Sequence, residues 1–357
     1  MKKNRVLCQL LALVLIGTFS LFGCAAKKTQ PDAGLAAEKA PDKLNVVTTL
    51  FPYYDFVRQV AGDDVKLTLV VPAGMDSHSF EPTPADMRLI QSADVLISNG
   101  GAMEHWLTEV LGAVDTEQMT VVTMMDHVNA VEEQLVEGME AEAHDHDHEA
   151  GEADEADESD ESDEADDHKS YVDYDGHEEE IEYDEHIWTS PVNAMTMVEV
   201  IRDTLAEADP EHAADYQAHA EAYLGELQQI DAGLREVSEN RVRNMIVIGD
   251  KFPFRYLADE YQLDYRAAFS GCSTDTEPSA KTIAYLIDKI REEQIPVVYY
   301  LELSTHRVSE IIGEETGATP LLLHSCHNVT RQQFDAGVTY VELMRGNIES
   351  LRKGLDE

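Results

Sequence analysis

The chain of 357 residues contains 26 lysines and arginines but 71 aspartates and glutamates, and its formal net charge at pH 7 is −45. A surface this acidic excludes nucleic acid and anionic lipid as direct partners, because both are bound through basic patches, and it favours a cationic ligand. Once the terminal and acidic segments described below are set aside, roughly 270 residues remain, which is enough for two domains of ordinary size.

The N-terminus indicates export from the cytoplasm. A basic MKKNR start precedes an apolar run over 6–19, a pattern typical of a signal peptide and too short for a membrane span. The run continues into LFGC, which matches a bacterial lipobox in which Cys24 becomes the lipid-modified N-terminus; an ordinary signal peptide cut just after this cysteine is the alternative. We expect a signal over 1–24, a lipid anchor at Cys24, and a flexible tether over 25–42 that holds the protein outside a bacterial cell membrane.

Residues 43–190 are predicted to form an N-terminal α/β lobe. Apolar runs predict strands over 44–49, 65–71, 93–98 and 121–124, and amphipathic patterns predict helices over 52–61, from 84 onward and over 103–112. Thr83 followed by Pro84 is a clear helix start, because threonine caps free N–H groups and proline fits the first helical turn. Strands that alternate with helices imply a parallel sheet with helices on both faces.

An acidic segment over 138–182 interrupts this lobe. It is too charged and too poor in apolar residues to form a core. Its HDHDH sequence alternates imidazoles with carboxylates, so we expect His144, His146 and His148 to capture metal ions on a mobile tether. A solvated acidic linker with no ligand is the alternative.

Two helices are predicted over 191–241. Ser190 and Pro191 repeat the cap-and-proline start and open a helix that runs to about residue 208. The next helix begins near Pro210, and one apolar stripe follows it at steps of four and three: Tyr216, Ala220, Tyr223, Leu227, Ile230, Leu234 and Val237. A helix of about 30 residues is roughly 45 Å long, which is enough to join two lobes.

Residues 242–357 are predicted to form a C-terminal α/β lobe. The expected strands are 245–248, 297–301 and 320–323, and the expected helices are 254–261, 279–292, 307–316 and 334–353. The predicted fold class is therefore α/β, with two lobes of parallel sheet flanked by helices and bridged by one long helix.

Two cysteines remain in the mature protein. Of the 4 in the chain, Cys8 leaves with the signal and Cys24 carries lipid, which leaves Cys272 and Cys326. In an oxidising exterior these two are able to form a disulfide. Cys326 lies between two histidines, so a free thiol near a metal ion is the alternative.

Candidate metal ligands follow the predicted strands. His78 lies in a loop between a strand and a helix, His324 and His327 follow the strand 320–323, and Asp250 ends the strand at 245–248; His186 precedes a helix. Ligand sites in open α/β sheets form at the carboxyl ends of the strands. Donors from several loops that converge there are suited to a cage for a borderline cation such as Zn²⁺.

Five stretches resemble the zinc- and manganese-binding solute-binding lipoproteins of ABC transporters. They are VTTLFPYYDFV at 47–57, GMDSHSFEPTPADM at 74–87, NGGAMEHWL at 99–107, HIWTSP at 186–191 and EPSA at 277–280. The resemblance covers nearly the whole mature chain. A histidine-rich acidic insert ahead of HIWTSP is a feature of the zinc-type members.

The resemblance implies a cluster A solute-binding fold, in which one rigid helix bridges two lobes and the metal lies between them. It implies His78 and His186 as ligands from the N-terminal lobe. The first usual ligand of the other lobe aligns with Lys251, which is no ligand while protonated, so Asp250 is the expected substitute. The second aligns with His324, with His327 and Cys326 in reserve.

The expected function is capture of Zn²⁺ and its delivery to an ABC permease by a monomeric, non-enzymatic protein. Nitrogen-rich ligation favours Zn²⁺ over Mn²⁺, which prefers oxygen donors. One alternative is a secreted zinc hydrolase with Glu302 as its base, although the chain has neither an H-E-x-x-H nor a G-x-S-x-G motif. The other alternative is a surface adhesin, a role attributed to some relatives.

Overall fold

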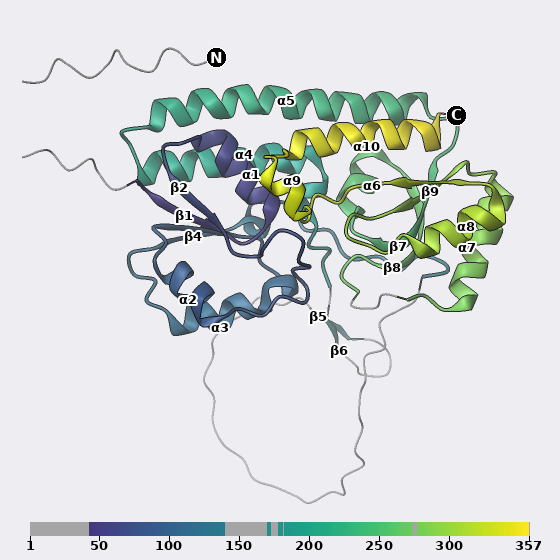
Figure 1. Ribbon diagram of the computed structural model, residues 1–357, viewed down its shortest axis with the longest axis horizontal. Coiled ribbons are helices and arrows are strands. Elements are labelled where there is room, and N and C mark those ends of the chain that lie inside the picture. Colours follow the sequence, from purple (N-terminus) through teal and green to yellow (C-terminus); the bar gives the residue numbers. More distant parts are fainter. Residues whose placement is uncertain (1–42, 140–169, 173–177, 181, 274–276, 357) are drawn as a thin grey trace, which may run out of the picture. The chain divides into compact units, whose positions relative to one another are not determined.

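The computed structural model describes residues 43–139, 170–172, 178–180, 182–273 and 277–356 (Figure 1). Residues 43–357 form one compact unit. The predicted signal, the lipid anchor at Cys24, and the ligands His144, His146 and His148 lie outside the described residues.

The first half of this unit is built on a parallel sheet of four strands in the order β2-β1-β3-β4. Its elements are β1 (Asn45–Thr48), α1 (Phe51–Ala61), β2 (Lys66–Leu69), α2 (Pro84–Gln91), β3 (Val95–Ser98), α3 (His105–Ala113) and β4 (Thr120–Thr123). The two central strands, β1 and β3, are buried along their whole length, which explains why both are continuous apolar runs. Thr83 caps α2 through the backbone N–H groups of Ala85 and Asp86, as its sequence predicts.

The second half carries another parallel sheet of four strands, in the order β10-β9-β7-β8. Its elements are β7 (Met245–Phe252), α6 (Arg255–Tyr261), β8 (Asp264–Ser270), α7 (Ala280–Glu293), β9 (Val297–Tyr300), α8 (Arg307–Thr316), β10 (Thr319–Leu322), α9 (Arg331–Asp335) and α10 (Tyr340–Leu355). A short antiparallel hairpin, β5 (Ser170–Val172) and β6 (Glu178–Glu180), lies outside both sheets.

Helix α5 (Ala213–Asn240) connects the two halves, and α4 (Pro191–Ala208) precedes it. Figure 1 shows α5 running along one side of both sheets, and it packs against α1 and α4 of the first half and α10 and α6 of the second. The seven residues of the predicted stripe are the seven buried residues of α5. The predicted α/β fold, with two parallel sheets flanked by helices and one long connecting helix, is confirmed.

The second half differs from the sequence-based prediction in one strand that was missed and one helix that is wrong. Strand β8, which pairs with β7, was not predicted, because DYRAAFS has neither a clean alternation nor a continuous run of large apolar residues. The single helix predicted over 334–353 is two helices, α9 and α10. Gly337 adopts a φ of +75° between them, and Thr339 then caps α10 with a reciprocal bond to Glu342.

Candidate metal ligands lie at or just after the carboxyl ends of parallel strands. The loop after β2 carries His78, Asp250 and Lys251 lie near the C-terminal end of β7, and the loop after β10 carries His324 and His327. No helix within the described ranges combines the length and the apolar character needed to cross a membrane.

Candidate metal centre

Three imidazoles from three distant segments form the candidate centre. One nitrogen each of His78, His186 and His327 lies within 4.8 Å of the other two, and within the described ranges this is the one such group of three or more histidine, cysteine or acidic side chains. The ring centroids are 5.6, 5.5 and 5.6 Å apart, a nearly equilateral triangle. Nitrogen donors arranged around a common point suit a tetrahedral Zn²⁺ ion.

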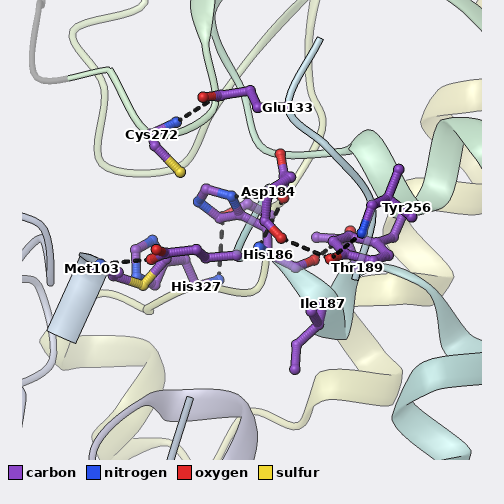
Figure 2. Close-up of polar contacts among 12 residues, drawn as sticks. Met103, Glu133, Asp184, His186, Ile187, Thr189, Tyr256, Cys272 and His327 are labelled. Atoms are coloured by element: carbon purple, nitrogen blue, oxygen red, sulfur yellow. Dashed lines mark hydrogen bonds and ion pairs between the residues drawn. The ribbon is translucent and has the colours of Figure 1, made fainter. Parts of the chain in front are cut away.

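His186 is oriented by the buried carboxylate of Asp184. The Nδ1 atom of His186 lies 3.2 Å from Oδ1 of Asp184, and the backbone N–H of His186 donates to the same oxygen at 2.8 Å (Figure 2). Because a carboxylate accepts and does not donate, Nδ1 carries the ring proton, which leaves the lone pair of Nε2 for a metal. Gly271 allows this close packing, since a Cβ atom there would lie 3.1 Å from Asp184 and 3.2 Å from His186.

His78 and His327 are held in the neutral form that binds metals. Burial, followed by repulsion from His186, lowers the pKa of His78 to about 4. Burial also lowers the pKa of His327 well below its usual range, with smaller contributions from His78 and His186. A metal ligand must be deprotonated, so neither ring needs to lose a proton at neutral pH.

The Nε2 atom of His78 is available to bind a metal ion. This atom is buried and has no hydrogen-bond partner among the described residues. A buried polar atom left without a partner is costly, so a ligand that fills the triangle would remove that cost. The donor set and its geometry therefore fit a divalent metal ion.

Lys251 adds a positive charge beside the centre. Its Nζ lies 3.7 Å from the carboxylate of Asp76, whose other oxygen accepts the backbone N–H of His78. The charge of Lys251 contributes to the lowered pKa of both His78 and His327. Asp250, the expected substitute ligand, does not join the group of three; its carboxylate accepts the backbone N–H of Lys251 at 2.9 Å, and burial raises its pKa.

His324 does not join the group either, although the sequence ranks it above His327. Its Nδ1 accepts the N–H of Cys326 at 3.0 Å and lies 3.5 Å from the carboxylate of Glu302. Its backbone N–H donates to the side chain of Asn347, and its carbonyl oxygen accepts a hydrogen bond from the same side chain. The two histidines follow the same strand, so the sequence contains no signal that distinguishes them. The fold turns His327 toward the centre and His324 toward Glu302.

The possible disulfide is not formed, because Cys272 and Cys326 are both free. Cys326 is fully buried, and its sulfur lies 3.8 Å from the carbonyl oxygen of His324. The backbone N–H of Cys272 donates to Glu133, and burial, together with the charge of Asp184, raises the pKa of its thiol well above the usual range (Figure 2). Neither thiol belongs to the group of three histidines.

Comparison with known proteins identifies related chains. The family described as zinc-uptake complex component A, periplasmic, matches residues 46–354. The zinc-binding lipoprotein AdcA of Streptococcus pneumoniae strain R6 is 30% identical over 321 residues, which are 90% of this chain and 57% of that protein. The high-affinity zinc uptake system protein ZnuA of Bacillus subtilis strain 168 is 29% identical over 320 residues, which are 90% of each chain.

The fold agrees with solved structures. The crystal structure of the Zn(II)-bound ZnuA-like domain of Streptococcus pneumoniae AdcA has a TM-score of 0.67 and 27% identity, and the match covers 88% of this chain and 100% of that one. The chain therefore spans a little over half the length of AdcA and corresponds to its ZnuA-like domain.

Proposed function

The chain belongs to the family of the periplasmic component A of zinc-uptake complexes, and from that premise we propose that it captures Zn²⁺ through His78, His186 and His327 for delivery to an ABC permease. The observation that carries the proposal is the triangle of three imidazoles whose nitrogens lie within 4.8 Å of one another. Nitrogen donors favour Zn²⁺ over Mn²⁺. The relatives AdcA and ZnuA are named for zinc binding and zinc uptake.

The chain's own residues prepare the site in three ways. Asp184 fixes the tautomer of His186, burial keeps His78 and His327 neutral, and the three rings are already gathered from segments far apart in the sequence. Each of these lowers the cost of binding, because no proton has to be displaced from the rings of His78 and His327 and little side-chain motion has to be frozen.

The proposed location and assembly rest on segments outside the described residues. We propose that lipid on Cys24 holds a monomer at the outer face of a bacterial cell membrane and that His144, His146 and His148 gather Zn²⁺ weakly nearby. AdcA of Streptococcus pneumoniae is named a lipoprotein, which supports an extracytoplasmic position.

The two alternative functions have no comparable support. The matched family is one of zinc uptake. Glu302, the base that a hydrolase would require, instead accepts hydrogen bonds from the backbone and hydroxyl of Ser325. No feature of the described residues favours an adhesin over a metal-binding transport protein.

Isothermal titration calorimetry of single variants tests the ligand set. We expect His327→Ala, like His78→Ala and His186→Ala, to abolish tight one-to-one zinc binding, because each removes one of three donors. The matched control is His324→Ala, which removes an imidazole three residues from His327 and should retain tight binding. The assignment fails if His327→Ala binds zinc as tightly as the unsubstituted protein.

A further inference from the structure

The loops that carry the three histidines are tied to one another by side chains that are not metal ligands. Asn328 follows His327 and is 4% exposed. Its Nδ2 donates to the carbonyl oxygens of Pro72 at 2.9 Å and Met75 at 2.7 Å, both in the loop that carries His78. Both hydrogens of one amide thus join segments more than 250 positions apart in the sequence.

The oxygen of the Asn328 side chain is also hydrogen-bonded. Its Oδ1 accepts the N–H of Val329 at 2.8 Å, which fixes the direction of the amide and turns Nδ2 toward the other loop. One residue earlier, Nε2 of His327 is hydrogen-bonded to the hydroxyl of Ser77. Two consecutive residues therefore hold the loop after β10 against the loop after β2.

A second tie connects the segment that carries His186. The indole N–H of Trp188 donates to the carbonyl oxygen of Ser325 at 2.8 Å, and the carbonyl oxygen of Trp188 accepts the hydroxyl of Tyr340 at 2.7 Å. Trp188 and Tyr340 are both fully buried. All three ligand segments therefore converge on residues 325–328, and the bonds from Asn328 and Trp188 run between protein atoms and need no metal.

We propose that Asn328 is a positioning residue that clasps the loops of His78 and His327 together and thereby sets how long zinc is retained. An arrangement of ligands that is held in place beforehand binds more tightly, because less freedom is lost when the ion arrives. Separation of the two loops, which would release the ion, requires both hydrogen bonds donated by Nδ2 of Asn328 to break. This inference rests on the proposed zinc site.

The alternative is that Asn328 only stabilises its own loop. Asn347 offers a matched control for that role. It is 1% exposed, its Nδ2 donates to the carbonyl oxygen of His324 at 2.7 Å, and its Oδ1 accepts the N–H of His324 at 2.7 Å. The side chain of Asn347 thus makes two hydrogen bonds to backbone atoms, against three for Asn328, but it joins α10 to a loop of the same half of the protein.

The experiment measures zinc dissociation from the full-length protein by stopped-flow mixing with a chromogenic chelator. We expect dissociation to be about tenfold faster for Asn328→Ala, since the loss of two hydrogen bonds costs roughly that factor, and intermediate for Asn328→Ser, which keeps one donor. Asn347→Ala should lower the unfolding temperature of the zinc-free protein and leave the dissociation rate within about twofold of the parent.

Amide hydrogen exchange gives a second readout that a purely structural role would not move. In zinc-free Asn328→Ala, amides of residues 73–78 should exchange faster, whereas Asn347→Ala should leave them unchanged. If Asn328→Ala does not fold, zinc dissociation from Asn328→Ser tests the inference in its place. The inference is overturned if the serine or alanine variant lowers stability as Asn347→Ala does while zinc dissociates at the parental rate. Failure of the parent protein itself to bind zinc would instead overturn the proposed function.

Discussion

Asp184 accepts a hydrogen bond from His186, with 3.2 Å between Oδ1 and Nδ1, and it is itself held by the other half of the protein. Its carbonyl oxygen accepts the hydroxyl of Tyr256 on α6 at 2.7 Å, and its N–H donates to Val131 at 2.9 Å. The hydroxyl of Tyr256 also accepts the N–H of Val131 at 3.2 Å. A histidine ahead of α4 is thus oriented by a carboxylate that is anchored to the second half.

Asp184→Asn should weaken zinc binding by about tenfold or more, because the loss of a carboxylate behind a ligating histidine commonly costs 10–100-fold in affinity. The amide keeps the shape of the side chain but removes the negative charge that favours the Nδ1–H tautomer. Competition against a chelator of known affinity measures the change, with the exposed Asp203→Asn as control. Equal affinity in the two variants would show that the orientation of His186 does not depend on Asp184.

Zinc binding near neutral pH should release almost no protons from His78 or His327. With a pKa of about 4 for His78, about one ring in a thousand is protonated at pH 7, and burial also lowers the pKa of His327. As the pH falls toward 4, His78 becomes protonated and the affinity should drop. Calorimetry in buffers with different ionisation enthalpies counts the protons. Release of two or more protons per zinc at pH 7 would contradict this prediction.

The sequence predicts the parts of the fold that depend on local periodicity. The stripe from Tyr216 to Val237 follows one face of α5 because a helix repeats every 3.6 residues wherever it packs. Strand β8 was missed because its place is set by pairing with β7, a long-range interaction that leaves a weak local pattern. His327 was ranked below His324 for the same reason, since side-chain direction in a loop follows from tertiary contacts such as those of Asn347 and Asn328.

Glu104→Gln should make the stability of the protein less dependent on pH. Glu104 is fully buried, accepts the N–H groups of Asn99 and Gly100, and has a pKa raised by burial from 4.5 to about 7. Between these two pH values the folded protein holds a proton that the unfolded chain has lost, so the free energy of unfolding falls as the pH rises. The free energy of unfolding that is lost in this way, once the pH is above both pKa values, is about 3 kcal/mol.

Urea unfolding at pH 5 and pH 8 tests this sign. Glutamine keeps an acceptor oxygen and carries no charge, so Glu104→Gln should gain stability relative to the parent between the two pH values. The exposed Glu117→Gln serves as control and should follow the parent at both. A constant difference between Glu104→Gln and the parent across this range would mean that Glu104 is ionised throughout.

Lys251→Met should strengthen zinc binding. Lys251 contributes a positive charge that lowers the pKa of His78 and His327, and the same charge repels a divalent cation bound between these rings. Methionine retains most of the side-chain length without the charge, and we expect a gain of about tenfold, equivalent to ~1.4 kcal/mol. Chelator competition at low and high salt measures it, and the exposed Lys281→Met controls for net charge. Weaker binding by Lys251→Met would indicate that Lys251 supports the site through Asp76.

Replacement of residues 142–181 by a short Gly-Ser linker should leave the tight zinc site intact. Residues that flank this segment pair with one another, because Glu132 pairs with Tyr183 and the N–H of Glu133 donates to the carbonyl oxygen of Glu182 at 2.9 Å. The replacement leaves these pairs in place, so Asp184 and His186 keep their anchors.

Calorimetric titration should show one tight site in both proteins, with dissociation constants within about threefold, and only the parent should show additional weak binding from His144, His146 and His148. A scrambled segment of equal length and charge, with its histidines replaced by glutamine, separates the contribution of imidazole from that of the acidic charge. Loss of the tight site in the linker variant would make the acidic segment the primary zinc binder and would remove the triangle of His78, His186 and His327 from that role.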